Sequence, residues 1–209
     1  MSGSTRGISY RNLMTVPGAR GAVTTPPPPH DIVGQPVTEF LPRGGDAELL
    51  LDCMERARKV FVDHPVNRRR REDGKTAATD IWPWSGGKKP SLAPFREKYG
   101  LVGGVISAVD LLGGIARLAG MEVIHVPGAT GFIDTDYEAK ARYAVDALDR
   151  LDFVYMHVEA PPDEAGHMGG SVEEKVRAIE RLDEAIGIVL DRPDTTVAVL
   201  PRPPDADPV

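Results

Sequence analysis

Imidazole and carboxylate side chains gather in one short stretch of the sequence, made up of His157, Glu159, Asp163, Glu164 and His167. Asp163 and His167 are four residues apart, and Gly166 between them lets the backbone bend so that both side chains can reach one metal ion. Mixed carboxylate and imidazole ligands suit zinc or manganese, and magnesium stays open. Taken alone, this spacing more often belongs to a solvated loop, because an Asp and a His four residues apart are common.

Two polar residues before this pair have other expected roles. His157 falls inside an apolar strand pattern, where a histidine is more often packed than bound to metal, so we do not expect it to be a ligand. Glu159 is a candidate to orient a liganding histidine through a hydrogen bond.

Two other stretches have the chemistry to hold an anion. One is the Gly-Ala-Thr-Gly turn at 128–131, whose backbone amides precede an expected helix; a plain tight turn is the alternative. The other is the run from Arg68 to Arg71, because guanidinium groups bind phosphate and carboxylate in a bidentate manner. Four consecutive arginines cannot all face one way, so most of them are expected on a solvated surface.

The elements that position these residues alternate between strands and helices in the second half of the chain. Apolar periodicity predicts strands at Val123–Val126, Phe153–Val158 and Thr195–Leu200, and helices at 104–118, 134–149 and 172–190. Asp134 is the expected N-cap of the second helix, and Ser171 with Glu174 forms a capping box before the third. This order predicts an α/β fold with a mostly parallel sheet flanked by helices, whose carboxyl edge carries the loop 159–170.

The first half of the chain differs from the second in composition and in apolar periodicity. Residues 1–45 are rich in proline and glycine and are expected to form loops with short extended pieces. From Asp46, a candidate N-cap, apolar residues recur at helical spacing as far as Phe61. A loop rich in tryptophan, proline and glycine then runs from Ile81 to Pro90. We therefore predict one domain over residues 1–92 and a second over residues 93–209.

Composition narrows the classes of function. The formal charge of −6 argues against nucleic acid as the main partner, and no apolar run is long enough for a membrane span or a signal peptide. The single cysteine, Cys53, cannot form an internal disulfide, which fits a reducing cytoplasm.

Seven stretches together resemble the archaeal type of 2,3-bisphosphoglycerate-independent phosphoglycerate mutase, a family of the alkaline phosphatase superfamily. They are SYRNL at 9–13, HDIVG at 30–34, HPVN at 64–67 with the following arginines, IWPW at 81–84, ISAVDLLGGIA at 106–116, VPGATGFIDTDYEAKA at 126–141 and HVEAPPDEAGH at 157–167. Each stretch is weak alone. Seven of them in this order form a specific pattern that spans most of the chain.

The resemblance implies a metal-binding core of the alkaline phosphatase type, of which residues 93–209 are part, and an inserted α+β domain that grips the substrate, of which residues 1–92 are part. The implied reaction interconverts 3-phosphoglycerate and 2-phosphoglycerate through a phosphoserine intermediate, with two divalent metals. Asp163 and His167 match two ligands of one metal. The positions expected to face the substrate are His30, Asp31, Asn67 and Arg70.

The chain also departs from the family pattern. The doubled proline at 161–162 is one residue longer than the usual motif. The segment with the serine nucleophile and the later segment with further metal ligands are not matched, so no catalytic residue is assigned and we expect the chain alone to be incomplete as a catalyst.

Two other interpretations stay open. One is a noncatalytic remnant or subunit that binds phosphoglycerate or a partner chain. The other is a related metal-dependent phosphotransferase or phosphatase acting on another phosphorylated acid. Besides phosphoglycerate, the expected partner is a complementary chain or a second copy in a homo-oligomer.

Overall fold

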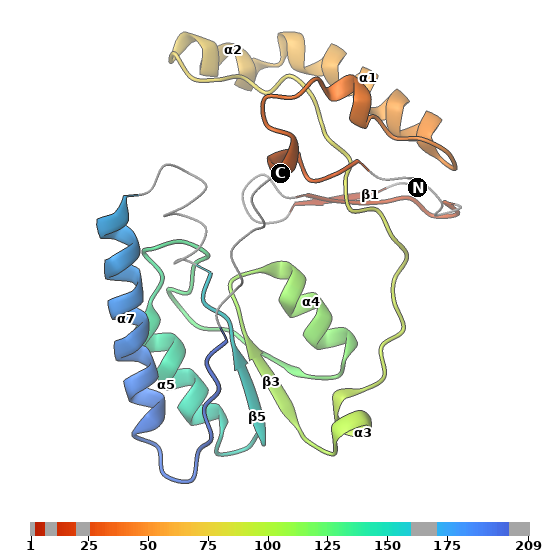
Figure 1. Ribbon diagram of the computed structural model, residues 1–209. Coiled ribbons are helices and arrows are strands. Elements are labelled where there is room, and N and C mark those ends of the chain that lie inside the picture. The colour runs from red at the N-terminus through yellow and green to blue at the C-terminus, as the bar shows by residue number, and fades with distance from the viewer. Residues whose placement is uncertain (1–2, 7–11, 20–25, 160–170, 201–209) are drawn as a thin grey trace. The chain divides into compact units, whose positions relative to one another are not determined.

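The computed structural model describes residues 3–6, 12–19, 26–159 and 171–200 (Figure 1). They fall into an N-terminal unit, built mainly from residues 13–89, and a C-terminal unit, built mainly from residues 90–209. Among the described residues, no helix combines the length and apolar character that crossing a membrane requires.

The N-terminal unit is dominated by two consecutive helices, α1 (Ala47–Asp63) and α2 (Pro65–Glu72). Asp46 occupies the predicted N-cap position of α1, although its side chain makes no capping hydrogen bond. His64 separates the helices: its Nδ1 accepts a hydrogen bond from the amide of Val66, and Pro65 starts α2. The 3-10 helices η1 (Pro29–Ile32) and η2 (Val37–Phe40) precede α1, and the short strands β1 (Gly3–Arg6) and β2 (Asn12–Thr15) pair with each other.

The C-terminal unit contains a three-stranded parallel sheet in the order β4-β3-β5. Its strands are β3 (Gly103–Ile106), β4 (Glu122–Ile124) and β5 (Phe153–Met156). Ile106 at the end of β3 is aligned with Ile124 of β4 and with Met156 of β5. All three strands therefore end at one edge of the sheet, as the sequence predicted for a parallel α/β fold.

Helices cover the two faces of this sheet unequally. On one face lies α5 (Tyr137–Ala147), with α7 (Val172–Leu190) packed against it (Figure 1). The core between α5 and the sheet consists of Ile106, Ile124, Ala144, Ala147 and Leu151, all buried. On the other face, α4 (Asp110–Leu118) packs on β3 and β4, and the short α3 (Phe95–Tyr99) lies nearby. The predicted class, a parallel sheet flanked by helices, is confirmed.

The capping box before α7 is confirmed as well: the Ser171 hydroxyl accepts from the Glu174 amide, and the Glu174 carboxylate accepts from the Ser171 amide. Other local predictions were wrong. Residues 103–106 form a central strand and not the start of a helix, because pairing on both sides outweighs the helical periodicity of 104–118. Residues 195–200 do not form a strand.

The second predicted strand also ends two residues early, at Met156 and not at Val158. At the start of α5 the N-cap is Asp136, whose carboxylate accepts from the Ala139 amide at 2.8 Å. Asp134, the predicted cap, instead accepts a hydrogen bond from the Thr130 hydroxyl.

Candidate functional site

The carboxyl edge of the parallel sheet brings together polar residues that are far apart in the sequence. Ser107 follows β3, His125 follows β4, and His157 follows β5. Ser107 and His125 also line a pocket of about 230 Å³, together with Arg117 from α4. This edge is where ligands bind in open α/β sheets.

His157 is held in place by the end of β3 and by its own strand, β5. Its amide donates to the Ile106 carbonyl at 2.8 Å, its ring stacks on Tyr155 with centroids 6.2 Å apart, and its Nδ1 lies 3.5 Å from the Ser107 hydroxyl. That separation is longer than the distance of about 2.6–3.2 Å that is typical between a serine nucleophile and its base. The Ser107 hydroxyl instead accepts from the Val109 amide at 3.0 Å, which gives it a role in the turn before α4.

A buried lysine that sequence analysis did not single out lies beneath this edge. The Lys140 side chain is 1% exposed, and its ammonium group donates to the carbonyls of Thr130 and His157, each at 3.4 Å. Burial lowers the pKa of Lys140, and the negative charge of Glu159 opposes that shift. Lys140 therefore joins the turn before α5 to the end of β5.

The signal for Lys140 was present in the periodicity of α5. Its buried positions are Tyr137, Lys140, Ala141, Ala144 and Ala147. A lysine among apolar residues at this spacing lies on the face that packs against the core. Such a residue is a site candidate because a buried ammonium group needs acceptors or an anion.

Glu159 lies against the same turn. A Cβ atom at Gly131 would come within 2.9 Å of the Glu159 carboxylate oxygen Oε2, so a side chain at position 131 would displace this carboxylate. The turn itself is held by internal bonds: the amides of Ala129, Thr130 and Phe132 donate to acceptors within 126–135. The structure therefore favours the tight turn over the anion cradle at 128–131.

The two residues predicted to bind metal, Asp163 and His167, lie outside the described residues, as does the doubled proline before them. Within the ranges that the structure describes, no group of three or more His, Cys, Asp and Glu side chains is placed to hold a metal ion. The structure positions Glu159, the last described residue before that loop, at the carboxyl edge of the sheet.

Two of the predicted substrate-facing residues, Asn67 and Arg70, lie on α2 in the N-terminal unit. Asn67 is 3% exposed, and its carboxamide is used within the fold: Nδ2 donates to the carbonyls of Phe61 and Ala78, and Oδ1 accepts from the Ala78 amide. Asn67 thus ties the end of α1 to the loop after α2. Arg70 is exposed, and its Nε donates to the Thr76 carbonyl at 2.7 Å.

A tryptophan connects the other predicted pair to the same loop. The indole Nε1 of Trp82 donates to the Pro27 carbonyl at 3.0 Å, which holds the segment containing His30 and Asp31 beside residues 81–84. Asp31 is exposed at the start of η1, and His30 is its neighbour. The structure therefore gathers segments 27–32, 67–70 and 76–84 within one unit.

The remaining arginines of α2 are mostly held by backbone carbonyls. Arg68 donates to Asp63, and Arg71 donates to Val62. The side chain of Arg69 makes no hydrogen bond or ion pair with another described residue, although its backbone carbonyl accepts from the Asp73 amide. The expectation that most of this run lies on a solvated surface is confirmed, since all four arginines are exposed.

Family models match nearly the whole chain. The metalloenzyme superfamily matches residues 48–201, and 2,3-bisphosphoglycerate-independent phosphoglycerate mutase matches residues 4–67. The 2,3-bisphosphoglycerate-independent phosphoglycerate mutase from Methanothrix thermoacetophila is 55% identical to this chain over 180 residues. These residues are 86% of this chain and 45% of the relative. A second such mutase, from Methanothermobacter thermautotrophicus, is 49% identical over 203 residues, or 95% of this chain and 50% of the relative.

The chain is also similar to a solved structure. The PH0037 protein from Pyrococcus horikoshii superposes with a TM-score of 0.59 at 37% identity, over 69% of this chain and 38% of that one. The chain spans about half the length of the curated relatives it matches. It belongs to the metalloenzyme superfamily, and its relatives within that superfamily are 2,3-bisphosphoglycerate-independent phosphoglycerate mutases.

Proposed function

We propose that this chain is the part of a phosphoglycerate mutase that grips the substrate and carries one metal-binding loop. The reaction interconverts 3-phosphoglycerate and 2-phosphoglycerate without 2,3-bisphosphoglycerate as a cofactor. The observation that carries this proposal is the 55% identity to the mutase of Methanothrix thermoacetophila over 180 residues, a length that includes both units. Membership of a metalloenzyme superfamily supports dependence on a divalent metal.

The metal-binding role falls to Asp163 and His167 in this proposal. Manganese or zinc fits an aspartate and a histidine, and magnesium is the further candidate. When bound, such an ion neutralises charge on the phosphoryl group as it moves. Glu159 and Lys140 support the start of this loop, because both lie at the carboxyl end of β5.

The substrate-gripping role falls to the N-terminal unit, as part of the inserted domain expected over residues 1–92. Arg70 uses only Nε within the described residues, which leaves its terminal nitrogens as donors for a carboxylate or a phosphate. His30 and Asp31 belong to the same proposed surface. Asn67 contributes by fixing the loop through its carboxamide.

The proposal includes a cytoplasmic location, where glycolysis and gluconeogenesis take place. A free Cys53 is compatible with that compartment. A complementary chain or a second copy is a further proposed partner.

A chimeric enzyme tests the proposed reaction. The 180 matched residues of the Methanothrix thermoacetophila mutase are replaced by those of this chain, and the products formed from 3-phosphoglycerate are separated and identified. We expect 2-phosphoglycerate without stoichiometric release of inorganic phosphate. Release of phosphate alone would favour the phosphatase interpretation, and a folded chimera that forms neither product would favour the noncatalytic remnant.

A further inference from the structure

Lys140 is the one charged side chain that is buried in the described part of the chain. It lies on the face of α5 that also carries Tyr137, Ala141 and Ala144, all of them buried. A buried ammonium group costs free energy unless an anion or good acceptors compensate it, whereas an apolar side chain would fill the same position without that cost. Packing alone therefore does not explain a charge at this position.

The two carbonyl groups that contact this ammonium group compensate it only in part. The carbonyl oxygens of Thr130 and His157 both lie 3.4 Å away, which is longer than is usual for a hydrogen bond. Both acceptors are neutral, and a neutral acceptor stabilises a cation less than an ionised one does. A nearby anion is therefore needed to offset the burial of Lys140.

Glu159 supplies that anion. Its carboxylate lies against the turn that contains Thr130, since a Cβ atom at Gly131 would come within 2.9 Å of its Oε2. The ammonium group of Lys140 reaches the carbonyl of Thr130, the residue before Gly131. The cation and the carboxylate thus contact adjacent residues of one turn, and the charge of Glu159 acts on Lys140.

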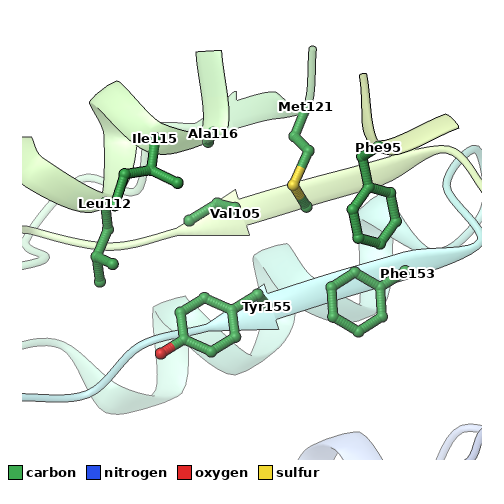
Figure 2. A pocket seen from close by; sticks show the side chains of 8 residues that line it. All are labelled: Phe95, Val105, Leu112, Ile115, Ala116, Met121, Phe153 and Tyr155. Atoms are coloured by element: carbon green, nitrogen blue, oxygen red, sulfur yellow. The ribbon is translucent and has the colours of Figure 1, made fainter. Parts of the chain in front are cut away.

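The other described surroundings of β5 offer no buried cation in place of Lys140. The pocket of about 200 Å³ on the face of β5 opposite α5 is lined by apolar side chains and by Tyr155 (Figure 2). Arg117, which lines the pocket at the carboxyl edge, lies on α4 and is exposed, so solvent screens its charge. Among the described residues of this region, only Lys140 carries a positive charge that is shielded from solvent.

The position of the pair relates it to the substrate. Lys140 contacts the carbonyl of His157, the first residue after β5, and Glu159 follows two residues later, at the edge where ligands bind in open α/β sheets. Phosphoglycerate carries several negative charges, so an uncompensated carboxylate at this edge would repel it. A cation beneath the edge that balances the carboxylate removes this repulsion.

We infer that Lys140 is a positioning residue for the substrate: its buried charge compensates Glu159, so that the carboxyl edge of the sheet admits a phosphorylated acid. Lys140 acts through Glu159 and does not itself contact the substrate, because it is 1% exposed. The inference rests on the proposed function, which supplies the phosphorylated acid. It predicts that affinity for the substrate depends on the sum of the two charges and not on either side chain alone.

Binding of 3-phosphoglycerate to the chimeric mutase tests this inference. Dissociation constants are measured by calorimetry with saturating manganese, at about 20 mM and about 0.5 M salt. Lys140→Met should weaken binding about tenfold at low salt and about threefold or less at high salt, because it leaves one uncompensated negative charge, which salt screens. Glu159→Gln should bind at least as tightly as the wild type. The double variant Lys140→Met, Glu159→Gln should lie within about twofold of the wild type.

A purely structural role of Lys140 predicts a different pattern. The contacts with the Thr130 and His157 carbonyls are lost in both variants that carry Lys140→Met, so the double variant would bind as weakly as the single one at both salt concentrations. That pattern, or weaker binding by Glu159→Gln alone, would overturn the inference. Lys175→Met, at an exposed position of α7, is the control and should bind as the wild type does.

Two further measurements keep the outcomes separate. Circular dichroism establishes that each variant is folded, and Lys140→Gln, which keeps a donor for the carbonyls without the charge, should weaken binding as Lys140→Met does. Turnover is recorded in the same chimera: a wild-type chimera that binds 3-phosphoglycerate without converting it contradicts the proposed reaction, and the affinities of the variants still decide the inference. A folded wild-type chimera that does not bind 3-phosphoglycerate overturns both.

Discussion

The ammonium nitrogen of Lys140 lies 3.4 Å from the carbonyl oxygen of His157, the first residue after strand β5. A second carbonyl, that of Thr130, lies at the same distance, and the charge of Glu159 acts on the same ammonium group. Lys140 thus joins a turn to a strand end, close to the charge of Glu159, at the edge of the sheet where the loop with the proposed metal ligands begins.

Replacing this lysine should destabilise the fold. Lys140→Met keeps the length of the side chain but removes the donors to both carbonyls and the charge that faces Glu159. We expect the free energy of unfolding to fall by about 1–3 kcal/mol in urea titrations. Lys175→Met, at an exposed position of α7, is the control and should change it by less than about 0.5 kcal/mol. Equal effects of the two substitutions would contradict the role given to Lys140.

The lowered pKa of Lys140 also predicts a dependence on pH. Between the lowered folded value and the ordinary value of 10.5, the unfolded chain binds more protons at this position than the folded chain does. Stability attributable to Lys140 should therefore rise with pH as the pH approaches 10.5 from below. The unfolding free energy of the wild type minus that of Lys140→Met should therefore increase from pH 7 to pH 10. A difference that stays constant or decreases would contradict this predicted pH dependence.

Asn67 should be a structural anchor of the loop 76–84. Asn67→Ala removes three hydrogen bonds of a buried carboxamide and leaves two carbonyls and one amide without their partner. We expect a loss of about 2–4 kcal/mol and a red shift of tryptophan emission, since both tryptophans, Trp82 and Trp84, lie in this loop. Arg69→Ala is the control: it should leave the emission unchanged.

Two glycines form a matched pair for core packing. A Cβ at Gly104 would lie 2.6 Å from a methyl group of Leu151 and 2.9 Å from one of Ile124, whereas a Cβ at Gly114 in α4 would meet no atom within 4 Å. Gly104→Ala should destabilise by about 1–3 kcal/mol through overpacking. Gly114→Ala should stabilise by about 0.5–1 kcal/mol, because alanine favours the helix. Thermal unfolding that shows the same sign for both would contradict the packing described for β3.

The fold followed from the sequence where local and tertiary preferences agree. The capping box of Ser171 and Glu174 and the apolar stripe of α7 depend on neighbours three or four residues away, so periodicity sufficed. The strand at residues 103–106 was not predicted, because it forms through pairing with residues about 20 and 50 positions further along the chain. Residues 195–200 have strand composition, but a strand also needs a partner, which composition does not specify.

The candidate site was less predictable for the same reason. The metal-binding role of Asp163 and His167 was predicted from residue types and spacing, which are local properties, and it stays a prediction. Lys140 and Asn67 act through backbone carbonyls contributed by other segments, and no pattern around either residue indicates those carbonyls. The burial of Lys140 was the one part that helical spacing could have indicated.

Turnover of the chimeric mutase, with and without the predicted ligands, tests the central claim most directly. Conversion of 3-phosphoglycerate is measured with added manganese in the chimera, in its Asp163→Ala, His167→Ala variant, and in a Glu164→Ala variant as the neighbouring control. The account predicts 2-phosphoglycerate formation that the double substitution reduces at least a thousandfold and that Glu164→Ala largely preserves. A folded chimera without turnover, or turnover that survives loss of both Asp163 and His167, would contradict it.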